Sequence, residues 1–313
     1  MHKPVIGVSS CLLGENVRYN GMHKRDSFIV DTLSQFVDFV GVCPEYESGM
    51  GVPREAMRLV GDVDNYKLLT SNTGRDMTPI MMDWIAKKLP ELDGENLCGF
   101  IFKSRSPSSG MERVKIYNGK GGMAGRGSGL FAKAFMERYP LLPCEDDGRL
   151  NDPVLRENFI ERIFTLDRYR EVAGSSKKAK DLVRFHSDHK YLLMSHSEKH
   201  CRQMGKLVAD GAKNKATFQE YEDMLLEAMK LKSTVRKHVN VLQHIMGYFK
   251  NQLTHDEKEE LLETIENYRN EYVPLIVPIT LLNHFERKYQ VEYLKTQYYL
   301  HPHPVELKLR NHA

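Results

Sequence analysis

The sequence has few of the features of an exported or membrane protein. Only five of its 313 residues are cysteine, an odd number scattered along the chain as Cys11, Cys43, Cys98, Cys144 and Cys201. No apolar run approaches the roughly 20 residues of a membrane-spanning helix, and the opening MHKPVIGVSS is too short and too strand-like for a signal peptide. We therefore expect a cytoplasmic protein with no membrane partner, whose cysteines are thiols or metal ligands rather than disulfides.

A large net charge is also missing, although the charge is unevenly distributed. The formal net charge is +3, and Lys plus Arg equal Asp plus Glu in number over residues 1–150. The excess therefore lies in the second half, where residues 177–215 contain ten Lys and Arg against four Asp and Glu. A basic segment of this kind favours an acidic polymer as partner.

Short β-rich apolar runs alternate with helical patterns in the first half. The runs are at residues 4–8, 38–42 and 98–102, and the helical patterns are near residues 27–37 and 78–89. This alternation predicts βαβ units, and hence a small α/β domain with a Rossmann-like parallel sheet over residues 1–150. Residues 151–180 are expected to form a connecting helix and linker, and the helical patterns that follow predict an all-α domain over residues 181–313.

Each apolar run of the first domain ends in a polar loop. Cys11 lies in SSCLLG, Cys43 in CPEYESGMGVPRE and Ser109 in KSRSPSSG. Because ligands of an open α/β sheet bind beyond the carboxyl ends of its strands, we expect these three residues to converge. A cysteine from each of three such loops could hold three irons of a four-iron cluster, leaving the fourth open to substrate. Two cysteines at strand ends are more often ordinary core thiols, so the residues alone leave both readings open.

Several separated motifs resemble a known family. Over residues 1–150, SSCLLGENVRYNG, VCPEYESGMGVPRE, GFIFKSRSPSSG and GMERVKIY are similar to the TudS-type thiouracil desulfidases, in which the third loop ends in SPSCG. FHSDHKYLLMSHS and the long helices after it resemble the YbgA-like helical domain. In this order, the two halves resemble the RudS group of tRNA 4-thiouridine desulfidases.

The resemblance implies a 4Fe-4S cluster held by Cys11, Cys43 and position 109, whose open iron binds the thiocarbonyl sulfur. It also implies Glu45 and Ser106 as catalytic groups, with Ser108 beside them. A carboxylate there can activate water or carry a proton as C4 of the pyrimidine becomes tetrahedral. A serine hydroxyl can hydrogen-bond the pyrimidine or the developing charge.

Ser109 departs from the family pattern. Its hard hydroxyl should ligate iron poorly, so we expect weak cluster binding and little turnover. Because every neighbouring motif is intact, we favour an introduced cysteine-to-serine change, and natural loss of the cluster is the alternative. Arg18 and Arg54 belong to the matched motifs and are expected to line the pocket.

Basic residues of the second half are expected to bind tRNA that contains 4-thiouridine, and no DNA. If residues 185–210 form one helix, Lys199, Arg202 and Lys206 share a face, which Lys213 joins if the helix continues. Such a row can follow a phosphate backbone, although a solvated face is the usual explanation. The further candidates are Arg105, Arg126, Lys177, Lys178 and Arg184.

Two more patterns have an ordinary and a functional interpretation. The glycine-rich residues 118–129 precede a helix and could cradle a phosphate with their amides, or form a surface loop. Four histidines, His186, His189, His196 and His200, fall on one stripe of the predicted helix. Because apolar residues share that stripe, packing is favoured over a zinc site.

The sequence therefore predicts an iron–sulfur desulfidase that converts 4-thiouridine in tRNA to uridine, with a helical domain that binds the tRNA. One alternative is a desulfidase of free thiopyrimidine bases. The other is a non-catalytic tRNA-binding protein with a decayed cluster site.

Overall fold

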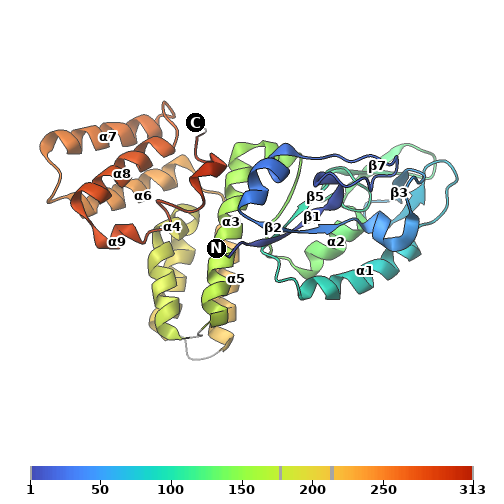
Figure 1. The fold of residues 1–313 in the computed structure, drawn as a ribbon, viewed down its shortest axis with the longest axis horizontal. Helices are drawn as coiled ribbons and strands as arrows, with labels where there is room; N and C mark the ends of the chain where they lie inside the picture. Colours follow the sequence, from blue (N-terminus) through green and yellow to red (C-terminus); the bar gives the residue numbers. More distant parts are fainter. Residues whose placement is uncertain (1, 176–177, 212–214, 312–313) are drawn as a thin grey trace. The chain divides into compact units, whose positions relative to one another are not determined.

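The computed structural model describes residues 2–175, 178–211 and 215–311 (Figure 1). The chain divides into two compact units, Met1–Leu155 and Arg156–Ala313. The first unit is α/β and the second is helical, which confirms the predicted fold class. Among the helices that the structure describes, none combines the length and apolarity needed to cross a bilayer.

A parallel sheet forms the centre of the first unit. Its strands are β1 (Val5–Ser9), β2 (Asp38–Val42), β5 (Gly99–Phe102) and β8 (Cys144–Asp146), in the order β2-β1-β5-β8. The three apolar runs are thus confirmed as neighbouring parallel strands. Every residue of β5 is buried, as is typical of a strand covered on both faces. Gly7 in β1 leaves room for Phe100, since a Cβ there would lie 2.2 Å from that ring.

A second four-stranded sheet was not predicted. It contains β3 (Met57–Gly61), β4 (Tyr66–Thr70), β6 (Val114–Tyr117) and β7 (Met123–Gly127), in the order β4-β3-β6-β7. Two antiparallel hairpins are joined by parallel pairing of β3 with β6. The glycine-rich segment is therefore the turn and second strand of a hairpin rather than a surface loop throughout.

Two helices cover the aromatic core of this unit, α1 (Thr78–Asp93) and α2 (Leu130–Arg138). The helical pattern at 78–89 is confirmed, whereas the pattern near 27–37 forms a π-helical turn (Phe28–Thr32) and a 3-10 turn (Leu33–Gln35). Alternate residues of a strand face the same side, so Phe100 and Phe102 stack with centroids 4.3 Å apart. Both rings contact Phe131 and Phe135 of α2, which fixes that helix on the sheet.

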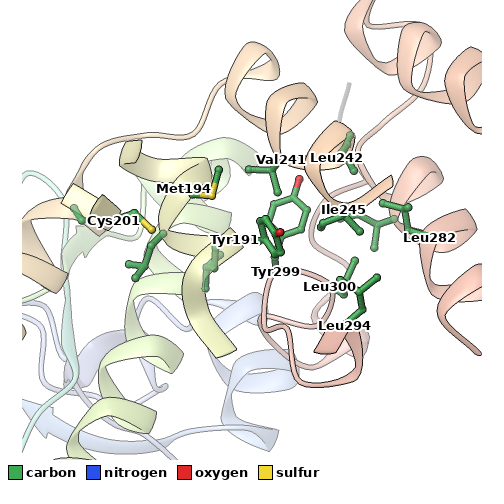
Figure 2. Packing of buried hydrophobic residues seen from close by; sticks show 14 of the residues in the cluster. Tyr191, Met194, Cys201, Val241, Leu242, Ile245, Leu282, Leu294, Tyr299 and Leu300 are labelled. Carbon is green, nitrogen blue, oxygen red and sulfur yellow. The ribbon is translucent and has the colours of Figure 1, made fainter. Parts of the chain in front are cut away.

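The second unit is built from long helices. They are α3 (Pro153–Ser175), which begins in the first unit, α4 (Ala179–Ala209), α5 (Lys215–Lys230), α6 (Val235–Met246), α7 (His255–Arg269), α8 (Ile276–Tyr289) and the short α9 (Glu292–Lys295). Figure 2 shows the core: Tyr191 and Met194 of α4 lie near Val241 and Ile245 of α6, with Tyr299 among them.

Helix α4 is not continuous, contrary to the single helix assumed from the sequence. Ser197 has φ −157° and ψ 105°, which are extended rather than helical angles. The break separates residues 179–196 from residues 198–209. Histidines on the two sides therefore do not share one helical stripe.

Arg310 links the C-terminal segment to helix α3 through hydrogen bonds and ion pairs. It is only 2% exposed, and its backbone N–H donates to Glu157 Oε2 at 3.1 Å. The guanidinium donates to Glu161 Oε1 at 2.7 Å and to the carbonyl of Tyr299 at 2.6 Å. Removing one partner of such a buried pair costs about 3–5 kcal/mol, because the other charge is left unpaired.

Candidate active site

One pocket of about 340 Å³ brings the three predicted loops together. Its walls include every residue predicted for the cluster and for catalysis, namely Cys11, Cys43, Glu45, Ser106, Ser108 and Ser109. Cys11 lies in a 3-10 turn directly after β1, and Cys43 directly follows β2. Because β1 and β2 are parallel with Ser9 opposite Val42, both loops leave the same edge of the sheet. The expected convergence is observed.

The thiols of both cysteines have raised pKa values. Burial and, to a smaller extent, the nearby Cys43 raise the pKa of Cys11 to about 11. Burial also raises the pKa of Cys43 above its usual value. Neither thiol is therefore activated as a free nucleophile, and a bound metal would have to displace the proton, as thiolate ligation requires.

The third loop is held by the start of helix α2. The carbonyl of Pro107 accepts from the amide of Leu130 at 3.2 Å, and that of Ser108 accepts from the amide of Phe131 at 2.9 Å. Gly129 permits this close approach, since a Cβ there would lie 2.5 Å from the carbonyl group of Ser108. The first amides of α2 are thus paired with the loop.

A chain of hydrogen bonds orients the polar groups of the pocket. Ser108 Oγ donates to Glu45 Oε1 at 2.7 Å and lies 3.0 Å from Ser106 Oγ. Ser106 Oγ also accepts from the backbone N–H of Ser109 at 3.1 Å. On the other side, Arg54 Nε donates to Glu45 Oε2 at 2.9 Å. Both carboxylate oxygens of Glu45 are therefore fixed.

Arg54 does more than line the pocket. Its guanidinium also donates to the carbonyls of Val17 at 3.0 Å and Gly51 at 2.9 Å. The same Val17 carbonyl lies 3.8 Å from Cys43 Sγ. Arg54 thus connects the loop after Cys11, the loop after Cys43 and Glu45. Sequence motifs placed it near the pocket but gave no sign of this connecting role.

Two further residues of the site, Lys103 and Asp147, were not predicted from the sequence. Lys103 lines the pocket, and its Nζ lies 2.8 Å from Asp147 Oδ2. Asp147 Oδ1 accepts from the backbone N–H of Ser104 at 2.6 Å, which ties the third loop to the end of β8. A strand of three residues has too little pattern to predict, although two consecutive aspartates at its end were a signal.

A basic cavity adjoins this pocket, and the two share Met57, Arg105 and Pro107. Its volume is about 860 Å³, and no carboxylate is among its lining residues, whose cations are Arg58, Arg105, Arg113, Lys115 and Arg126. Lys115 and Arg126 are directly opposite each other across the β6–β7 hairpin. Like charges in this position destabilise a hairpin. Of the predicted tRNA-binding residues, Arg105 and Arg126 therefore lie beside the catalytic pocket.

The other predicted basic residues lie on the second unit. Lys199, Arg202 and Lys206 are exposed on α4 beyond the break, and Arg202 pairs with Glu198. Arg184 lies before the break and is 3.6 Å from Asp188, so it does not extend the row. Lys178 is exposed at the start of α4. Lys177 and Lys213 fall outside the described residues.

The four histidines of α4 have separate partners, as the packing interpretation predicts. His186 contacts the Tyr221 hydroxyl at 3.0 Å, and His189 contacts the Phe185 carbonyl at 2.8 Å. His196 lies 3.2 Å from Glu161, and His200 lies 2.8 Å from Ser197. Within the described part of the chain, they do not form a common metal site.

Comparisons with known proteins divide the chain in the same order. Residues 6–147 match the family model 2-thiouracil desulfurase, and residues 190–304 match a protein family of unknown function, DUF1722. Uncharacterized protein YbbK of Bacillus subtilis is 37% identical over 138 residues, covering 41% of this chain and 87% of YbbK. Uncharacterized protein YbgA of Escherichia coli is 27% identical over 153 residues, covering 48% of this chain and 90% of YbgA. The solved 4Fe-4S-dependent thiouracil desulfidase TudS is 27% identical, with a TM-score of 0.39 over 48% of this chain and 95% of TudS.

Proposed function

The chain belongs to the 2-thiouracil desulfurase family through residues 6–147, and on this basis we propose that it removes sulfur from 4-thiouridine in tRNA to leave uridine. The observation that carries the proposal is a pocket that joins the buried thiol of Cys11 and the half-buried thiol of Cys43 to a fixed carboxylate and two serine hydroxyls. Water replaces the sulfur at C4, so that C4=S and H₂O become C4=O and H₂S.

We propose that Cys11, Cys43 and the side chain at position 109 are the ligand positions of a 4Fe-4S cluster. Thiols from adjacent strand ends fit the soft thiolate ligands of such clusters, whereas the Ser109 hydroxyl does not. When bound, the cluster would supply a soft Lewis acid for the departing sulfur. Cluster retention by this chain should therefore be weak.

The protein groups have distinct roles in this proposal. Glu45 is held through Oε2 by Arg54, and Oε1 faces Ser108, so Oε1 is the atom that accepts the proton of the attacking water. The hydroxyls of Ser106 and Ser108 would exchange their bonds in the chain to Glu45 for hydrogen bonds to the pyrimidine as charge develops on it. Lys103, paired with Asp147, keeps the third loop in position.

A phosphate-bearing substrate is supported by the basic cavity. Arg105 borders both the catalytic pocket and this cavity, so a base in the pocket would have its backbone phosphates within reach of cations. The repulsion between Lys115 and Arg126 would be relieved by a bound anion. The exposed row Lys199, Arg202 and Lys206 would supply further phosphate contacts from the second unit.

Desulfidation of free thiopyrimidine bases is the second candidate, favoured by the description of the matching family, which names thiouracil. The third candidate is a protein that has lost catalysis and still binds tRNA. It is favoured because Ser109 stands at the position of the third cluster ligand. The first two are separated by kcat/KM of the Ser109→Cys variant on 4-thiouridine in tRNA and on free 4-thiouracil. A higher value for the free base would overturn the tRNA proposal.

The cluster assignment is tested by anaerobic reconstitution of the chain and of its Ser109→Cys variant. The variant should hold about four irons per chain and should desulfidate faster by on the order of a hundredfold, because a soft ligand replaces a hard one. Equal iron content and equal rates in both proteins would remove position 109 from the ligand set.

The tRNA-binding assignment is tested by the salt dependence of affinity. Replacing Lys199, Arg202 and Lys206 by Ala should weaken tRNA binding and reduce the slope of log K against log salt by about 0.7–0.9 for each phosphate that is no longer neutralised. Lys258→Ala on α7, a lysine flanked by acidic residues, is the matched control and should leave the slope unchanged. An unchanged slope in the triple variant would remove this row from the tRNA interface.

A further inference from the structure

The basic cavity beside the catalytic pocket contains a row of cations on one face of the second sheet. Arg58 of β3 and Lys115 of β6 each precede by one residue the paired Leu59 and Ile116, whose side chains are fully buried. Because side chains alternate along a strand, Arg58 and Lys115 lie on the outer face. Arg126 of β7 is directly opposite Lys115 on that face. Three adjacent strands therefore each present a cation, at the strand spacing of about 4.8 Å.

The described part of the chain offers this row no counter-charge. Arg58, Lys115 and Arg126 form no ion pair there, and no carboxylate lines the cavity. Another cation of the wall, Arg113, lies 3.4 Å from Glu112. Like charges directly opposite each other destabilise a sheet, so the row costs stability when the cavity holds no anion. An anionic ligand would remove that cost.

Two further arginines of the cavity have an unfavourable backbone conformation. Arg105 has φ 61° and Arg113 has φ 57°, in the left-handed region where glycine is the usual residue. Both line the cavity, and Arg105 also lines the catalytic pocket. Residues held in such a conformation cluster at ligand sites. Arginine at two such positions is therefore better explained by a need for its charge than by the backbone.

The size of the cavity and one aromatic residue favour a nucleotide over an isolated phosphate. The volume is about 860 Å³, against about 340 Å³ for the pocket in which the pyrimidine would lie. Tyr117 lines the cavity, two residues after Lys115 and hence on the same face of β6. The Arg58 guanidinium lies 5.6 Å from its ring. Proteins bind single-stranded RNA with this combination, because aromatic rings stack on bases while cations neutralise phosphates.

The cavity and the catalytic pocket share Met57, Arg105 and Pro107, so their ligands would be neighbours. We propose that the cation row and Tyr117 bind the nucleotide that adjoins 4-thiouridine in an RNA strand, with Arg105 at the phosphate between the two nucleotides. This inference rests on the proposed desulfidation of RNA. It assigns recognition of the strand, as opposed to the isolated base, to the first unit.

Calorimetry on the full chain with Ser109 tests the inference, since little turnover is expected and the ligands stay intact. The ligands are 4-thiouridine, its 5′- and 3′-monophosphates, and the two dinucleotides in which uridine is joined at its 5′ or its 3′ side. One dinucleotide should bind about tenfold or more tightly than the monophosphate of the same side, through stacking and phosphate contacts. Equal affinities, which indicate a site for a free anion only, or no binding of either dinucleotide would overturn the inference. The proposed function fails separately, if reconstituted Ser109→Cys leaves the sulfur on these ligands and on thiolated tRNA.

Variants of the row locate the binding. Lys115→Gln and Tyr117→Leu should each remove most of the gain of the dinucleotide and leave the affinity for 4-thiouridine unchanged. Lys67→Gln is the matched control, because Lys67 lies on β4 of the same sheet, pairs with Asp76 at 3.0 Å and does not line the cavity. Lys115→Gln should also raise the urea midpoint by relieving repulsion, which separates lost affinity from unfolding. Parent-like dinucleotide binding by Lys115→Gln and Tyr117→Leu would show that this cavity is not the site.

Discussion

At position 109, one atom separates the observed pocket from a complete set of thiol ligands. The Ser109 side chain is 4% exposed and shares the pocket with the thiols of Cys11 and Cys43. Its backbone N–H is bonded to Ser106 Oγ, and the neighbouring carbonyls are bonded to α2. The conformation of the loop therefore does not depend on the hydroxyl of Ser109. For this reason, a cysteine at this position should restore the ligand without rebuilding the loop.

Arg54 is not a proposed cluster ligand, yet it holds groups of the pocket in place, so its replacement tests the pocket without removing a ligand. In the Ser109→Cys background, Arg54→Gln should lower kcat by tenfold or more and reduce iron content, because Glu45 and the carbonyl of Val17 lose their common donor. Arg54→Lys should recover only part of the lost kcat and iron content. A lysine ammonium lacks the planar array of donors with which the guanidinium reaches Glu45, Val17 and Gly51. Iron content is measured after anaerobic reconstitution and kcat on thiolated tRNA.

The control for this prediction is Arg18→Lys, which changes another arginine of the pocket wall that stacks beside Tyr19, 5.8 Å from its ring. It should retain iron. If Arg54→Gln kept both the iron content and kcat of its parent, the connecting role of Arg54 would be wrong.

Among the elements, α2 and the third loop approach each other too closely for a larger residue at Gly129. A Cβ at Gly129 would lie 2.5 Å from both the carbon and the oxygen of the Ser108 carbonyl, which are backbone atoms. Gly129→Ala should therefore displace the loop, lower the free energy of unfolding by about 1–3 kcal/mol and reduce iron uptake in the Ser109→Cys background. Urea unfolding and iron analysis measure the two effects.

Gly119→Ala provides the matched control, because a Cβ there has nothing within 4 Å. It should leave both stability and iron uptake close to those of the parent. Full iron uptake by Gly129→Ala would show that the loop can move away from α2 without loss of the site.

The same elements show what a single sequence can predict. Strands β1, β2 and β5 were recognisable because they are apolar runs that end in polar loops, and their parallel pairing brings the loops to one edge. The second sheet was missed because strands such as VKIY have four residues and alternate buried with exposed positions, too little pattern to distinguish from a loop. The break at Ser197 could not be predicted either, because it contains neither Gly nor Pro, the residues that usually mark a helix break.

At the scale of the whole molecule, the two units bury their polar groups differently. In the first, polar side chains surround a pocket. In the second, neutral histidines are packed into the core, and burial lowers the pKa of His186 to about 4 and of His238 to about 3. His189 is likewise shifted well below its usual pKa by burial. The second unit is therefore expected to be the acid-sensitive one.

The sign of this effect follows from proton binding. These histidines titrate near pH 6.5 in the unfolded chain, so the unfolded state binds more protons below that pH and the folded state loses stability as the pH falls toward 4. At pH 5, each histidine should cost about 2 kcal/mol relative to pH 7.5. Glu157 opposes this, because burial raises its pKa to about 7 and its folded form gains a proton first. His301 and His303 have pKa values lowered by burial as well, so one opposing group against five histidines leaves a net loss of stability.

Urea unfolding at pH 7.5 and pH 5.0, followed by tyrosine fluorescence and by circular dichroism, measures this loss as a lower midpoint for the helical unit. His238→Gln removes one titrating group while keeping a polar side chain near the Tyr299 hydroxyl, which His238 Nδ1 contacts at 3.0 Å. Its stability should fall less between the two pH values, by about 2 kcal/mol. His255→Ala removes an exposed histidine and should leave the pH dependence unchanged. A helical unit equally stable at both pH values would mean that these buried rings accept protons without unfolding.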